Sequence, residues 1–165
     1  MTSAAPPRPR VYVETSVLSY LTALPSRDIV RIAHQQLTTE WWASREEFEL
    51  FVSDVVLSEA RRGDAGAATR RVEAAAGLSV LTTTPVIEHP AGSLLGAAAL
   101  PAKAAIDAVH VAIAAVHGMH FLLTWNYAHI ANAAMRPRID AVCRRSGFEP
   151  PIICTPEELR TRGKP

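Results

Sequence analysis

The sequence lacks the features that mark several classes of protein. Its 165 residues include only two cysteines, Cys143 and Cys154, which suit neither a disulfide framework nor a paired zinc site. No apolar stretch reaches the roughly 18 residues that cross a bilayer. The first ten residues also lack the apolar region of a secretory signal. We therefore expect a soluble, cytoplasmic protein without a membrane segment.

An excess of charge of either sign is also missing. The 17 Lys and Arg residues nearly balance the 16 Asp and Glu residues. The chain therefore has no basic field of the kind that binds nucleic acid by bulk charge. A polyanionic ligand would need a metal ion or a local patch such as Arg61-Arg62, Arg70-Arg71 or Arg144-Arg145. Each of these pairs is more simply explained as the solvated face of a helix.

Apolar residues, by contrast, are plentiful. They make up 48% of the sequence, enough for a sizeable core, which excludes intrinsic disorder, collagen and coiled coil for the chain as a whole. The Pro- and Ala-rich residues 1–9 predict a disordered lead-in. The remaining residues 10–160 have the length of one domain.

Short β-rich runs alternate with helical patterns along this domain. Strands are predicted at residues 10–14, 48–52, 78–82, 120–124 and 152–154. Helices are predicted at residues 15–21, 26–45, 53–62, 64–76, 101–117 and 137–146. No connection is a tight hairpin, so the pattern predicts a parallel sheet with helices on both faces.

Three further helical segments are less regular. Residues 86–99 are rich in Ala, but Pro90 and Gly92 should break or delay a helix there. A short helical piece should follow residue 124. Thr155 carries a capping-box signal, which predicts the start of a last helix.

Polar residues follow several of the predicted strands, where ligands bind in open α/β sheets. They are Glu14, Thr15, Ser16, Asp54, Thr124 and Asn126. Two more acids, Glu59 and Asp107, lie on predicted helices. Asp54 is more simply explained as a helix cap, and Glu59 alone is weak evidence because Glu is common on helix surfaces.

Asp107 is the least expected of these residues. It lies among Ala, Ile and Val, about two turns inside the predicted helix 101–117, which is too deep for an N-cap. A carboxylate in such surroundings is costly to bury unpaired. A structural role would need an Arg partner or a protonated carboxyl; the alternative is a metal-binding or catalytic role.

Three carboxylates that converge in one cleft would repel one another without a cation. Oxygen ligands of this kind suit Mg²⁺ or Mn²⁺ better than zinc. Such an ion lowers the pKa of a bound water and neutralises charge on a phosphate. It would also allow a nearly neutral protein to approach a polyanion.

Four segments, in this order, resemble the motifs of PIN domains. They are VYVETS at residues 11–16, VSDVVLSE at 52–59, AIDAVHVA at 105–112 and LTWN at 123–126. The likeness extends to the VapC-like toxin ribonucleases of bacterial type II toxin–antitoxin systems and covers roughly residues 10–155. It implies a five-stranded parallel sheet in a three-layer α/β/α sandwich. It also implies Mg²⁺- or Mn²⁺-dependent cleavage of RNA, a small antitoxin protein as inhibitor, and a homodimer.

The resemblance also assigns residues to the site. Glu14, Glu59 and Asp107 match the three acids that hold the metal ion, and Asn126 matches the position of a fourth catalytic acid. Ser16 matches a small hydroxyl residue that supports the metal ligands, and Thr124 would support them from the fourth strand.

Two positions depart from the family pattern. Glu14 is one methylene longer than the usual Asp, and Asn126 offers a carbonyl oxygen without a charge. Three negative charges in place of four should bind a second metal ion less well, which leaves one-metal occupancy or weak activity open. The departures also leave open a different function, that of a PIN-fold module that binds RNA or protein with little or no catalysis.

The histidines offer further candidates. His110 lies three residues after Asp107 on the same face of the predicted helix. It could be a metal ligand, a base, or a partner that orients a carboxylate. His129 and Asn132 follow Asn126 closely and are candidates to line the same cleft or to contact substrate.

Overall fold

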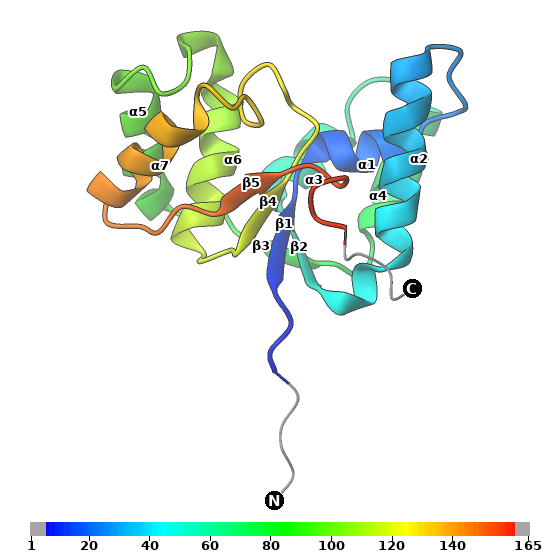
Figure 1. Cartoon of the computed structure of the whole chain (residues 1–165), viewed down its shortest axis with the longest axis horizontal. Coiled ribbons are helices and arrows are strands. Elements are labelled where there is room, and N and C mark those ends of the chain that lie inside the picture. Colours follow the sequence, from blue (N-terminus) through cyan, green and yellow to red (C-terminus); the bar gives the residue numbers. More distant parts are fainter. Residues whose placement is uncertain (1–5, 161–165) are drawn as a thin grey trace, which may run out of the picture.

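A computed structural model of the chain, which describes residues 6–160, shows five strands in one sheet with helices on both sides (Figure 1). The strands are β1 (Arg10–Val13), β2 (Glu49–Ser53), β3 (Ser79–Leu81), β4 (Phe121–Leu123) and β5 (Ile152–Cys154). Their order is β3-β2-β1-β4-β5, and all four pairings are parallel. The predicted five-stranded parallel sheet is therefore confirmed.

Strand β1 lies at the centre of the sheet. Its Val11, Tyr12 and Val13 are fully buried, as expected for a strand that is covered on both faces. Val11 pairs with Leu50 of β2 on one side and with Phe121 of β4 on the other. The residue that follows β1 therefore lies in the middle of the sheet's carboxyl edge.

The helices form two groups, one on each face of the sheet (Figure 1). The first group is α1 (Thr15–Thr22), α2 (Ile29–Ala43), α3 (Asp54–Ala60) and α4 (Ala65–Ala75). The second group is α5 (Glu88–Gly96), α6 (Ala105–Val116) and α7 (Arg136–Arg145). The predicted three-layer α/β/α sandwich is thus confirmed. No helix within residues 6–160 is long and apolar enough to cross a membrane.

Side chains at the helix ends explain several of the boundaries. The Ser53 hydroxyl accepts a hydrogen bond from the Val56 amide and caps α3. Asp28 caps α2 by accepting from the Arg31 amide, so this helix begins at Ile29 and not at the predicted residue 26. Gly147 follows α7 with a φ of +89°, a conformation that ends a helix and that glycine adopts without steric cost.

Two predictions about helix starts were wrong. Residues 102–104 form a separate 3₁₀ turn, and α6 begins only at Ala105. Asp107 therefore lies in the first turn of α6, not two turns inside a helix. Pro90 does not interrupt α5, because it is the third residue of that helix, where the missing N–H costs little.

Two predicted short helices are also absent from the described residues. Residues after 124 form turns up to the start of α7. At Thr155 the expected reciprocal bonds do form, since its amide donates to the Glu158 carboxylate at 2.8 Å and the Glu158 amide donates back to the Thr155 hydroxyl at 3.3 Å. The next residues nevertheless make a turn rather than a helix.

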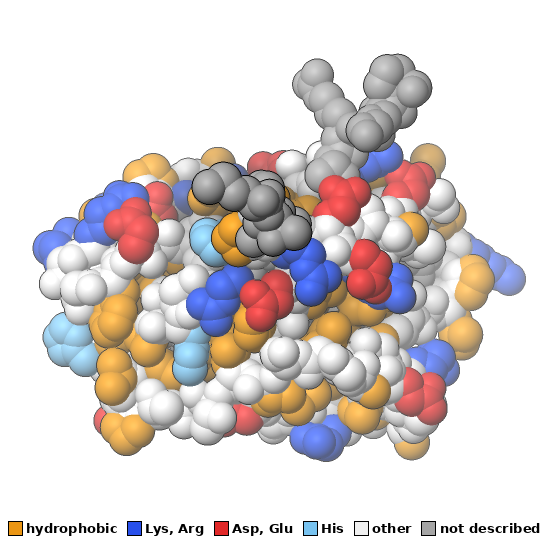
Figure 2. Space-filling view, turned by 90° about the horizontal axis from the view of Figure 1, so that it is seen from below, with side chains coloured by type: hydrophobic (Ala, Val, Ile, Leu, Met, Phe, Trp, Pro, Cys, Tyr) orange, Lys and Arg blue, Asp and Glu red, His pale blue; other side chains and the backbone are white. Residues whose placement is uncertain are grey.

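The segment before β1 falls partly outside the described residues, since residues 1–5 of the predicted lead-in are not among them. Residues 6–9 have no helix or strand. Arg8 donates to the Glu46 carbonyl and the Glu49 amide donates to the Pro9 carbonyl, at 3.1 and 2.9 Å. On the side where β1 begins, basic and acidic side chains intermingle over the described surface (Figure 2).

The chain order across the sheet reverses between β1 and β4. From β1 the chain proceeds to β2 and β3 on one side, and later places β4 and β5 on the other. In open α/β sheets the crevice outside the carboxyl ends of such strands is the usual ligand site. Glu14 directly follows β1 and Thr124 directly follows β4, so both lie at this switch point.

Candidate metal centre

Glu14 is held at the end of β1 by neutral donors only. It is the N-cap residue of α1, and its Oε2 accepts from the Ser16 amide at 3.1 Å, from the Ser16 hydroxyl, and from the Thr124 hydroxyl at 2.8 Å. Its exposed fraction is only 6%. No ion pair within residues 6–160 gives it a cationic partner. A buried carboxylate without a counter-charge is costly, and a cation beside it would remove that cost.

Glu59 reaches the same place from α3. Its Oε2 accepts from the Thr15 hydroxyl at 2.6 Å and lies 2.8 Å from Nε2 of His110. The other ring nitrogen of His110 lies 2.8 Å from the Tyr12 hydroxyl, which in turn bonds the Ser53 hydroxyl at 2.8 Å. The buried imidazole is therefore clamped between a tyrosine and a carboxylate.

Glu59 and His110 each favour the charged form of the other. Burial alone would raise the pKa of the Glu59 carboxyl, but hydrogen bonds from His110 and Thr15 outweigh it and lower the pKa. Burial would lower the pKa of His110, but the bond to Glu59 and the negative charges of Glu14, Glu59 and Asp107 raise it. His110 thus experiences the field of all three acids.

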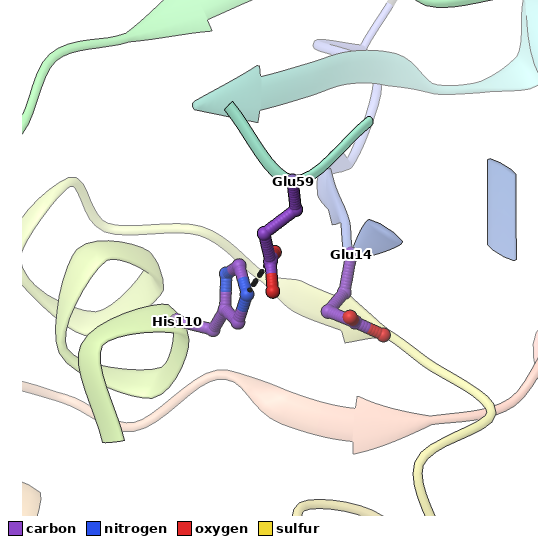
Figure 3. A group of neighbouring side chains, drawn as sticks. All are labelled: Glu14, Glu59 and His110. Atoms are coloured by element: carbon purple, nitrogen blue, oxygen red, sulfur yellow. Dashed lines mark hydrogen bonds and ion pairs between the residues drawn. The ribbon is translucent and has the colours of Figure 1, made fainter. Parts of the chain in front are cut away.

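Figure 3 shows Glu59 of α3 and His110 of α6 pointing toward each other, with Glu14, which follows β1, beside them. One ligand atom from each residue lies within 4.8 Å of the others. The two carboxylates supply oxygen donors that favour Mg²⁺ or Mn²⁺, while His110, whose ring nitrogens contact Glu59 and Tyr12, orients the Glu59 carboxylate. The residues present at the site therefore fit the metal ion that the sequence predicts.

Asp107 lies outside this group of three. Its side chain, 18% exposed, accepts at Oδ1 from the Asn126 amide nitrogen at 2.9 Å, and its Oδ2 lies 2.6 Å from Nδ1 of His129. No arginine forms an ion pair with Asp107 within residues 6–160, so a structural role through an arginine pair finds no support. The structure thus brings Glu14 and Glu59 together, with Asp107 in an adjoining pair with His129.

Hydrogen bonds nevertheless connect the two acid sites. The Thr124 hydroxyl that donates to Glu14 also accepts from the Asn126 amide at 2.9 Å. Asn126 in turn donates to Asp107 and accepts from the His129 amide at 3.2 Å. This path follows the carboxyl edge of the sheet from β1 to the segment after β4. Glu14 and Asp107 therefore belong to one polar network.

Comparisons with known proteins identify the family of this chain. A model of the PIN domain family matches residues 11–133, a span that contains every residue of the network. The chain belongs to the PIN domain family. No curated protein matches the sequence.

Two solved structures share the fold of this PIN domain. One is VapBC2 from Rickettsia felis bound to a DNA fragment from their promoter, with a TM-score of 0.55 and 12% identity, covering 88% of this chain and 98% of that chain. The other is Mycobacterium tuberculosis VapC20, a sarcin-ricin loop cleaving toxin, with a TM-score of 0.55 and 20% identity. The match covers 84% of this chain and 95% of the VapC20 chain. At these identities the likeness extends to the fold alone.

Several contacts of the PIN domain were not foreseen from the sequence. Tyr12 holds His110, and Thr15 donates to Glu59. Tyr12 could have been predicted as a neighbour of the site. Side chains two residues apart on a strand share a face, and Tyr12 precedes Glu14 by two. The prediction that Asp54 caps a helix was wrong, because Ser53 is the N-cap of α3 and Asp54 is its first residue. Asp54 instead accepts from the Val55 and Thr83 amides at 2.8 and 2.9 Å, contacts that match a structural role.

Proposed function

We propose that this PIN domain is an endoribonuclease that depends on Mg²⁺ or Mn²⁺ and hydrolyses phosphodiester bonds of RNA. The observation that carries the proposal is the buried carboxylate of Glu14, which has only neutral donors and lies beside the carboxylate of Glu59 at the switch point of the sheet. Two carboxylates placed so close repel each other unless a cation lies between them.

The residues proposed to hold the ion are Glu14, Glu59 and Asp107, with Asn126 as a further catalytic residue. When bound, a divalent ion acidifies a water and neutralises the charge that builds on a phosphate. The chain's own side chains orient the ligands. Ser16 and Thr124 hold Glu14, while His110 holds Glu59 through a bond of 2.8 Å, as partners of metal-binding carboxylates commonly do.

Asp107 is the third proposed ligand, because hydrogen bonds through Asn126 and Thr124 connect its carboxylate to that of Glu14 and because its charge acts on His110. It lies in the first turn of α6, where the positive end of the helix dipole stabilises a carboxylate. Asn126 donates to it and so supplies a polar contact where the family pattern has a fourth acid.

We also propose that the protein is the toxin of a toxin–antitoxin pair, with a small antitoxin protein as partner, and that it forms a homodimer in the cytoplasm. The order of the four motifs and the fold shared with VapBC2 and VapC20 support this. Exposed apolar side chains at the start of α2 and just before it, among them Leu24, Ile29 and Val30, offer surface that a protein partner would cover.

An RNA cleavage assay tests the proposed activity. The purified chain should cleave RNA in Mg²⁺ or Mn²⁺ and stop when EDTA removes the ion. Glu59→Gln keeps the size of the side chain, removes its charge, and should slow cleavage at least about 100-fold. Cleavage that survives both EDTA and this change would contradict the proposal. Tight RNA binding without cleavage in any divalent ion would instead favour a PIN-fold binding module.

A further inference from the structure

Four aromatic rings lie directly beside the candidate metal centre. We call Tyr20 of α1, His34 of α2, Trp125 and Tyr127 the aromatic cluster. His34 stacks on Trp125 with 4.1 Å between ring centroids and an angle of 18°. Tyr127 lies 6.0 Å from Trp125 and 5.8 Å from His34. Trp125 and Tyr127 flank Asn126, so the cluster adjoins the network of Glu14 and Asp107.

The inner rings of the aromatic cluster are rigidly placed. The Trp125 amide donates to the Ser16 hydroxyl at 2.9 Å, and its indole N–H donates to the Thr38 hydroxyl at 2.8 Å. Trp125 is only 5% exposed. Tyr20 packs edge-on against both His34 and Trp125. The same serine hydroxyl contacts Glu14, so the position of Trp125 is tied to that of the proposed metal ligand.

Tyr127 is the outer member of the aromatic cluster and is 47% exposed. Its amide donates to the Trp125 carbonyl at 2.9 Å, a tight turn that brings its ring back toward Trp125. A half-exposed aromatic ring with a rigid backing is the arrangement on which unpaired bases of single-stranded nucleic acids stack.

The hollow beside Tyr127 favours a base over a phosphate. Its volume is about 530 Å³, and its polar lining consists of Asn132, Arg136, Thr155, Glu157 and Glu158. Arg136 already pairs with Glu158 at 3.6 Å. Two carboxylates against one paired guanidinium leave the lining net negative, which disfavours a phosphate, whereas a neutral base with polar edges meets amide, hydroxyl and carboxylate groups there. Asn126 of the network directly precedes Tyr127 in the chain, and a divalent ion at the candidate metal centre would attract the phosphate.

We propose that Tyr127, backed by Trp125 and His34, stacks on an unpaired base of single-stranded RNA and so positions the adjoining phosphate at the candidate metal centre. This inference rests on the proposed ribonuclease function and adds the way in which the substrate is held. Over the described surface on the side where β1 begins, charges of both signs intermingle (Figure 2), so that side has no comparable attraction for a polyanion.

Binding of a labelled single-stranded RNA of about ten nucleotides tests this inference. The Glu59→Gln chain in Mg²⁺ serves as the background, because binding is then measured without cleavage. Adding Tyr127→Ala should weaken binding roughly tenfold, since it removes one base–aromatic stack. Tyr127→Phe keeps the ring and should remain within about twofold of the background. Ile152→Ala removes another exposed apolar side chain, on β5, and is the control that should leave RNA binding unchanged.

A second RNA strand, abasic at every position, separates stacking from other effects. The Glu59→Gln chain should bind this abasic strand with the same affinity whether or not it also carries Tyr127→Ala, because the strand has no base to stack. A tenfold loss for this strand too would overturn the inference, since Tyr127 would then act on the backbone or on the fold. If the parent chain cleaves RNA but Tyr127→Ala binds RNA as well as the background does, the inference about Tyr127 is overturned while the proposed ribonuclease function stands. A parent chain that neither binds nor cleaves RNA would overturn the proposed function with it.

Discussion

The three acids at the carboxyl edge of the sheet differ in the partners that hold them. Glu59 and Asp107 each have a histidine, His110 and His129, within 2.8 Å. Glu14 has only hydroxyl and amide donors. The pKa of His110 is raised by its bond to Glu59 and by the nearby acids, so this histidine can supply positive charge to Glu59 without metal. Glu14 has no such bonded partner among the described residues and depends more on a bound cation.

Asn126→Asp is the first test at the scale of single residues. The change replaces the donor to Asp107 by a second carboxylate, 2.9 Å from the first at the present distance. Without metal, the variant should lose about 1 kcal/mol of unfolding free energy, because a hydrogen bond becomes a repulsion. With Mn²⁺, it should bind the ion more tightly and cleave RNA at least as fast. Thermal melts with and without Mn²⁺ measure both effects; unchanged Mn²⁺ affinity would place Asn126 outside the metal ligands.

The sequence predicted His110 as a possible partner of a carboxylate, and it contacts Glu59, but the contacts of Thr15 with Glu59 and of His129 with Asp107 were not predicted. Glu14 and Asn126 could be located because they follow strands whose apolar character is unmistakable. The bond from Thr15 to Glu59 could not, because it depends on how far α3 leans toward α1. The depth of Asp107 was misjudged because Pro101 marks the start of a 3₁₀ turn rather than the start of α6.

At the scale of helices and strands, Asp54 at the start of α3 is an acid that stabilises the fold. Asp54 accepts from the amide and hydroxyl of Thr83, at 2.9 and 2.5 Å, and thereby joins α3 to the segment after β3. Burial alone would raise the pKa of its carboxyl, but these bonds and the one from Val55 lower it. A carboxyl with a lowered pKa stabilises the fold only while it is ionised.

The lowered pKa of Asp54 determines how the stability of Asp54→Asn should depend on pH. The variant should lose about 0.5–1 kcal/mol at neutral pH, a small loss because the carboxylate is exposed and screened. The loss should fade as the pH drops below about 4, where the parent carboxyl itself becomes protonated. Urea melts across this range measure it, and Thr83→Val completes a double-mutant cycle. A loss that stayed constant down to acid pH would contradict an ionised carboxylate.

A glycine pair tests the end of α7. Gly147 has a φ of +89°, whereas Gly96 at the end of α5 has no such conformation, and neither has a neighbour within 4 Å of an added Cβ. Gly147→Ala should therefore cost about 1 kcal/mol through backbone strain. Gly96→Ala, the matched control, should leave stability unchanged or raise it slightly. Equal effects of the two changes in urea melts would argue against a left-handed residue at 147.

The strands could be predicted because each is a short run of apolar, β-rich residues. Most helices could be predicted because apolar residues recur at helical spacing and capping residues mark their ends. The segment after β4 could not. The Asn126 side chain accepts from the His129 amide and the Asn132 side chain accepts from the Ala134 amide. These local bonds compete with helical ones, and they hold the segment as turns against the candidate site.

At the scale of the whole molecule, the fold places the candidate metal centre at one edge of the sheet and the two cysteines within the core. Cys143 of α7 and Cys154 of β5 are both free and buried. Burial raises the pKa of the Cys143 thiol to about 11 and that of the Cys154 thiol to about 12. Since the thiolate is the reactive form, these thiols report on opening of the fold.

Thiol labelling should therefore follow unfolding. At pH 8 the native chain should react slowly with a disulfide reagent, and both thiols should react at once in denaturant. Saturating Mn²⁺ should slow the native reaction further, because an ion that binds only the folded state stabilises it. Rapid reaction of one thiol in native buffer would show a local opening in the half of the molecule that contains α7 and β5.

Binding of Mn²⁺ by the purified chain at neutral pH tests the central claim most directly. Calorimetric titration should show saturable binding by the parent chain and at least about tenfold weaker binding by Glu14→Gln, which keeps the size of the side chain and removes the buried charge. Glu88→Gln, on the exposed surface of α5, should bind as the parent does. A parent chain that binds no Mn²⁺, or a Glu14→Gln chain that binds it equally well, would contradict the account.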